Sequence, residues 1–122
     1  MQKELFDFVA ERADILAAAD TSKQETKEAA QAWKDAVAAD GSDAAVEAAT
    51  NALLDFLEGR MLGIDDLIGF LEGPGAGIFG EEACAAMLTA QKERKEQGEK
   101  YCNCEAHTAA GELLAKFGRI EL

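Results

Sequence analysis

The spacing of apolar residues constrains the fold most strongly, because they recur every three or four positions along most of the chain. In the first such stretch Leu5, Phe8, Val9 and Leu16 fall on one side of a helix. The composition favours residues with high helix propensity, such as alanine, leucine, glutamate and lysine, and the only proline is Pro74. The sequence therefore predicts an all-α fold.

Capping residues and glycines divide this pattern into separate helices. Ser22–Glu25 has the spacing of a capping box at a helix start, and Ser42 is a second N-cap candidate. Gly41 is expected to end a helix in the left-handed conformation, and Gly73–Gly77 is expected to be a turn. The chain is thus predicted to be one domain over residues 1–122, a single-domain bundle of five to six short amphipathic helices. The predicted helices span about 3–19, 22–40, 42–63, 64–72, 81–97 and 104–117.

The chain is strongly acidic, with 24 Asp and Glu against 12 Lys and Arg and a formal net charge of −12. Such a chain repels nucleic acid and anionic membrane surfaces, whereas basic partners and metal ions remain compatible with it. No apolar run approaches the roughly 18 residues of a membrane span, and the N-terminus has no signal-peptide pattern. Three cysteines do not make a disulfide framework, so a cytoplasmic protein with reduced thiols is expected.

The segment Cys102-Asn103-Cys104-Glu105-Ala106-His107 carries the clearest chemistry. Cys104 and His107 are three residues apart, so a helix places them on the same face, and Cys102 lies just before that helix. Thiolate sulfur and imidazole nitrogen are ligands that suit zinc, and the N-terminal end of a helix favours the thiolate. The spacing predicts a metal site.

A closed structural zinc site needs a fourth ligand, for which Cys84 is the predicted residue. Glu105 or a carboxylate from another helix is an alternative. Two further interpretations use the same residues. Cys102 and Cys104 could form a reducible disulfide in a redox protein, or they could be ordinary thiols beside a capping histidine.

Several kinds of site are not predicted. The glycine segment 73–77 lacks the lysine and Ser/Thr of a phosphate-binding loop, so no nucleotide cofactor is expected. Asp65 and Asp66 are adjacent on a helix, so their carboxylates point in different directions. His107 is the only histidine, and no nucleophile-elbow pattern accompanies it. We therefore expect no enzyme activity.

Four stretches carry a resemblance to a known family: Lys27–Trp33, Ile64–Ile68, Ile78–Gly80 and Lys100–Cys104. They look like a family of small acidic bacterial proteins of unknown function, whose members are often labelled ninety-kilodalton heat-shock chaperones. Members usually have a cysteine where this chain has His107. They also have an adjacent cysteine pair where this chain has Ser22-Lys23. The histidine preserves a ligand type, whereas the pair is lost.

The chaperone label itself does not fit the residues of this chain. A chaperone of that class needs an ATP-binding α/β domain, and a chain of 122 residues without predicted strands cannot supply one. The leading expectation is a small, non-enzymatic binding or stress-associated protein with a structural zinc. The alternatives are a thiol redox protein using Cys102 and Cys104, and a metal-independent module that binds an unidentified protein partner.

Overall fold

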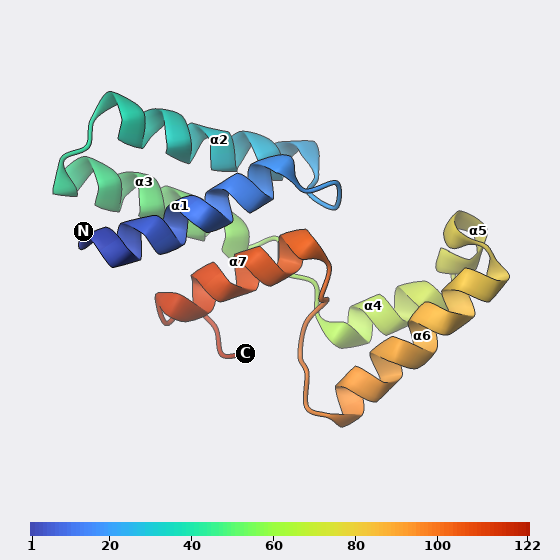
Figure 1. Ribbon diagram of the computed structural model, residues 1–122. Helices are drawn as coiled ribbons and strands as arrows, with labels where there is room; N and C mark the ends of the chain where they lie inside the picture. Colours follow the sequence, from blue (N-terminus) through green and yellow to red (C-terminus); the bar gives the residue numbers. More distant parts are fainter. The chain divides into compact units, whose positions relative to one another are not determined.

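The computed structural model describes residues 1–122 and contains seven α-helices and no strand (Figure 1). The all-α prediction is confirmed, but the expected number of five to six helices is too small. The additional helix has five residues; it begins inside the glycine segment 73–77 that is predicted to be a turn and extends beyond it to Phe79. Pro74 precedes it with helical backbone angles, because the proline ring fixes φ in the range that a helix needs. The helices are α1 (Lys3–Ala18), α2 (Gln24–Ala39), α3 (Asp43–Glu58), α4 (Ile64–Glu72), α5 (Gly75–Phe79), α6 (Glu81–Glu96) and α7 (Glu105–Lys116).

The helix ends follow the sequence signals in some places and depart from them in others. The Ser42 hydroxyl accepts a hydrogen bond from the Ala45 N–H at 3.3 Å, which confirms this N-cap. The predicted capping box at Ser22 is wrong. The N-cap of α2 is Lys23, one residue after Ser22, and the Ser22 hydroxyl is buried without a hydrogen-bond partner. Gly41 is not left-handed, because Asp40 is extended and its carboxylate accepts from the N–H two residues on.

The chain divides into two compact units, and the first comprises Met1–Met61 and Asn103–Glu121. In this unit α2 packs against α1 and α3, and α7 also packs against α1 and α3 (Figure 1). Its core contains a buried hydrogen bond of 3.0 Å from the Trp33 indole N–H to the Thr50 hydroxyl. The buried apolar residues of this core are Val9, Ala13, Leu16, Ala19, Ala30, Trp33, Leu53, Leu54, Leu57, Ala106, Ala109, Ala110, Leu113 and Leu114.

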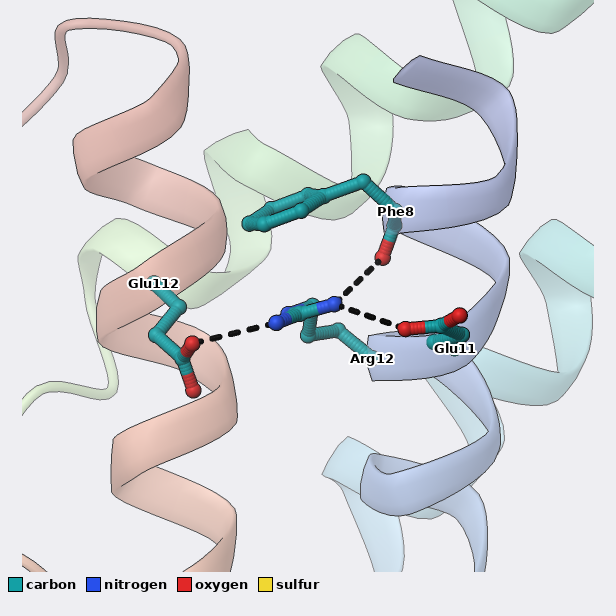
Figure 2. Close-up of polar contacts among 4 residues, drawn as sticks. All are labelled: Phe8, Glu11, Arg12 and Glu112. Carbon is teal, nitrogen blue, oxygen red and sulfur yellow. Dashed lines mark hydrogen bonds and ion pairs between the residues drawn. The ribbon is translucent and has the colours of Figure 1, made fainter. Parts of the chain in front are cut away.

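Arg12 connects α1 to α7 from within the otherwise apolar face of α1. Its side chain is only 18% exposed, and its guanidinium lies 3.7 Å from the centroid of the Phe8 ring. Figure 2 shows the guanidinium between α1 and α7. It donates hydrogen bonds to the carboxylates of Glu11 and Glu112 at 3.1 Å each and to the Phe8 carbonyl at 3.4 Å. The long side chain thus contributes both apolar contact and charge at this helix–helix interface.

The second unit, Leu62–Cys102, contains α4, α5 and α6, which all contact one another. Its apolar interior is small, with Ile64, Ile68, Leu71 and Cys84 as the buried side chains. The two ends of this unit pair through an isolated antiparallel bridge between Gly63 and Tyr101. None of the seven helices combines the length and the apolar character that crossing a membrane requires.

Candidate metal centre

Cys102, Cys104 and His107 bring their ligand atoms together, with every pair within 4.8 Å. All three belong to one stretch of six consecutive residues, so the convergence is a local property of this segment. The structure therefore unites three of the four residues that the sequence singles out, and each is partly buried.

The Cys104 side chain serves as the N-cap of α7. Its backbone is extended, and its Sγ accepts a hydrogen bond from the His107 N–H at 3.4 Å. Thr108 donates to the Cys104 carbonyl at 2.9 Å, which is the first regular hydrogen bond of the helix. Ala106, whose N–H has no carbonyl within the helix to bond, donates to the Thr21 hydroxyl at 3.0 Å. Because the His107 and Ala106 N–H groups would otherwise be unsatisfied, their bonds to side chains fix the first turn of α7 and with it the two ligand positions.

The His107 ring is held at both nitrogens. Nδ1 lies 3.0 Å from Cys104 Sγ, and Nε2 lies 3.1 Å from the Arg60 carbonyl oxygen. A carbonyl oxygen can only accept, so Nε2 carries a hydrogen, and in the neutral ring Nδ1 keeps its lone pair. Metal-binding histidines typically donate their other ring N–H to such a carbonyl, which fixes the tautomer. Nδ1 is therefore the His107 atom that could hold a metal ion.

The distances fit a tetrahedral zinc ion with little movement. Zn–N bonds of about 2.0–2.1 Å and Zn–S bonds of about 2.3 Å place nitrogen and sulfur roughly 3.5 Å apart and two sulfurs roughly 3.8 Å apart. The Cys104–His107 pair at 3.0 Å must open slightly, and the group as a whole lies within 4.8 Å. Changes of this size are within the reach of side-chain rotation at the start of a helix.

The pKa of His107 is raised above its ordinary value of 6.5, chiefly by the hydrogen bond with Cys104. Burial opposes this shift, and the Cys104 charge and the Arg60 carbonyl add to it. The hydrogen bond to the sulfur therefore stabilises the protonated ring more than it is stabilised in an isolated histidine. A metal ion at Nδ1 would compete with a proton for the same lone pair.

Cys102 is positioned by backbone pairing just before the site. Its N–H donates to the Leu62 carbonyl at 2.9 Å, next to the bridge that joins Gly63 and Tyr101. These bonds hold the backbone a few residues before α7, although no regular strand forms. The sequence gives no indication of this pairing.

Cys84 does not belong to the group that contains the other three candidates. It is 3% exposed in α6, and its thiol donates to the Leu71 carbonyl at 3.0 Å. This placement makes it a small core residue of the second unit. The exposed alternative, Glu105 in the first turn of α7, does not join the group either.

The structure adds two supporting contacts that sequence reasoning did not find, the Arg60 carbonyl and the Thr21 hydroxyl. A backbone carbonyl leaves no residue-type signal, and a threonine in a loop is too common to single out. Comparison with protein families, with curated proteins and with solved structures finds no match for this chain.

Proposed function

We propose that this chain is a small, non-enzymatic zinc-binding protein that holds the metal with Cys102, Cys104 and His107. The single observation that carries the proposal is the convergence of two sulfurs and one imidazole nitrogen within 4.8 Å. The hydrogen bond from Nε2 to the Arg60 carbonyl supports it, because it leaves Nδ1 as the ligand atom.

The donor set favours zinc over the alkaline-earth ions. Calcium and magnesium take oxygen ligands, whereas thiolate and imidazole suit zinc. The fourth position would be filled by a carboxylate from another helix or by a donor from another molecule. In this proposal the metal is structural, because it would fasten the first turn of α7 through a histidine already bonded to the chain segment that follows α3.

Zinc content measured by elemental analysis after purification under reducing conditions tests the proposal. We expect about one zinc per chain in the unmodified protein and a large loss in Cys104→Ser and His107→Gln. Cys84→Ala is the matched control and should keep its zinc. Cobalt substitution should give the intense visible bands of tetrahedral thiolate coordination. Sub-stoichiometric zinc in the unmodified protein, or equal zinc in all variants, would contradict the proposal.

A second candidate, a metal-independent interaction module, is favoured by an open apolar hollow of about 350 Å³ on α2 and α3. Its lining includes Trp33, with alanines around it. The net charge of −12 favours a basic amphipathic helix as occupant. Titration with a lysine-rich amphipathic peptide should change the Trp33 fluorescence, whereas a glutamate-rich peptide of the same pattern should not. Equal responses to both peptides would count against this candidate.

A further inference from the structure

The two sulfurs of the metal group are close enough to react with each other. Cys102 and Cys104 lie within the 4.8 Å span of the group, on backbone outside the helices. Residues two apart in extended backbone have Cα atoms roughly 6.5 Å apart. This separation lies within the range of about 4.4–6.8 Å that disulfides span. A bond between them therefore needs only a local rearrangement.

The three thiols differ in their access to an oxidant. Cys104 is partly exposed, stands at the N-terminus of α7 and has the His107 ring 3.0 Å from its sulfur. Cys84, in contrast, is 3% exposed and donates its thiol hydrogen to a carbonyl. The accessible pair thus coincides with the candidate metal ligands, and the buried thiol is separate from them.

We propose that hydrogen peroxide oxidises Cys104 and Cys102 to a disulfide and thereby releases the metal, an inference that rests on the proposed zinc site. The Cys104 thiolate attacks one peroxide oxygen, the O–O bond breaks, and the departing hydroxide takes a proton to form water. The resulting sulfenic acid is attacked by the Cys102 thiolate. The S–S bond forms, the S–O bond breaks, and the departing hydroxide takes a proton to form a second water. The two sulfurs supply the two electrons that reduce the peroxide.

The disulfide removes two of the three protein ligands, because its sulfurs no longer carry the charge that binds zinc. His107 alone cannot retain the ion, since structural zinc sites use four ligands. A dithiol reductant restores both thiols by exchange through a mixed disulfide, and the site can then be reloaded. The segment thus couples metal occupancy to the oxidant level.

The test uses the full-length zinc-loaded protein and equimolar hydrogen peroxide. A colorimetric chelator measures released zinc, and mass spectrometry with peptide mapping locates the oxidised sulfurs. We expect one zinc released for each disulfide between Cys102 and Cys104, with a mass loss of two hydrogens. Dithiothreitol followed by added zinc should reverse both changes. The control Cys84→Ala should behave like the unmodified protein.

Cys102→Ser separates the two chemical steps. In this variant Cys104 should still form a sulfenic acid, trapped by dimedone as a mass adduct, and no loss of two hydrogens should follow. A protein that holds zinc and keeps it under peroxide overturns this inference alone. Independent oxidation of all three cysteines at similar rates does the same. A protein that never holds zinc overturns the proposed function and this inference together, since no metal is present to be released.

Discussion

Replacing Thr50 with valine should destabilise the first unit by about 1–2 kcal/mol. The Thr50 hydroxyl accepts from the Trp33 indole N–H at 3.0 Å, and the two residues are 2% and 3% exposed. Valine has nearly the same shape but no acceptor, so the indole N–H would stay buried and unpaired, at a cost of about 1–3 kcal/mol. The added methyl group recovers up to about 0.8 kcal/mol through apolar burial. The melting temperature should fall by about 4 °C for each kcal/mol.

A double-mutant cycle with Trp33→Phe isolates the hydrogen bond. In the phenylalanine background there is no indole donor to strand, so Thr50→Val should cost close to nothing. Thr50→Ser is the matched control, because it keeps the hydroxyl and loses one methyl group, at about 0.8 kcal/mol in either background. Helical circular dichroism during urea unfolding is the suitable probe, since Trp33→Phe removes the only tryptophan.

The cycle can also refute the reasoning. If Thr50→Val costs the same in both backgrounds, the hydrogen bond adds no net free energy and the contact is held by apolar packing alone. If Thr50→Ser is the more damaging change in the unmodified background, the methyl group matters more than the hydroxyl.

Three other perturbations have definite expected outcomes. Glu112→Gln should remove the ion pair with Arg12 and lower the free energy of urea unfolding by at most about 1 kcal/mol, since both groups are partly exposed. The loss should be smaller at high salt, which screens the pair, and a loss that does not depend on salt would contradict this. Gly75→Ala should destabilise by about 1–3 kcal/mol in thermal unfolding, because the new methyl group meets a backbone carbonyl at 3.1 Å and a thiol sulfur at 3.2 Å; unchanged stability would show that these neighbours yield. In metal-free protein, NMR titration of His107 should give a midpoint above 6.5, and Cys104→Ser should lower it. Because the folded-state pKa is the raised one, the contribution of His107 to stability is complete below the unfolded-state pKa and is lost as pH rises through the folded-state pKa; a midpoint that does not respond to Cys104→Ser would remove the sulfur as its cause.

The fold was predictable where local signals determine it. Ser42 sits directly before a helix with a free N–H three residues on, so its hydroxyl caps that helix as expected. Ser22 has the same local pattern, but its side chain is buried and α2 begins one residue later. Tertiary packing determines which of the two serines caps its helix, and the local sequence pattern does not reveal that packing. The short helix α5 escaped prediction because glycine and proline predict breaks far better than they predict brief helices.

The candidate site also has parts that the sequence predicts and parts that it does not. Cys104 and His107 are three residues apart at a helix start, so helix geometry predicts that their side chains meet, and Cys102 is close enough along the chain to join them. The contacts that support them come from 47 and 85 residues away, through a carbonyl and a threonine hydroxyl. Cys84 was the predicted fourth ligand because of its residue type and because its helix can double back against the last helix. Its burial in the second unit depends on how α4 and α6 pack, which residue type does not reveal.

Cys84 is the one buried apolar side chain of α6, and this has a consequence for how the dynamics of the second unit can be followed. A thiol reagent can reach this sulfur only when α6 separates from its neighbours. The labelling rate is therefore proportional to the fraction of molecules in which α6 is open. With the other two cysteines replaced by serine, the ratio of this rate to that of an unstructured peptide gives the local opening equilibrium constant. Cys84, which lies outside the candidate metal group, is therefore a built-in probe of the local opening of α6.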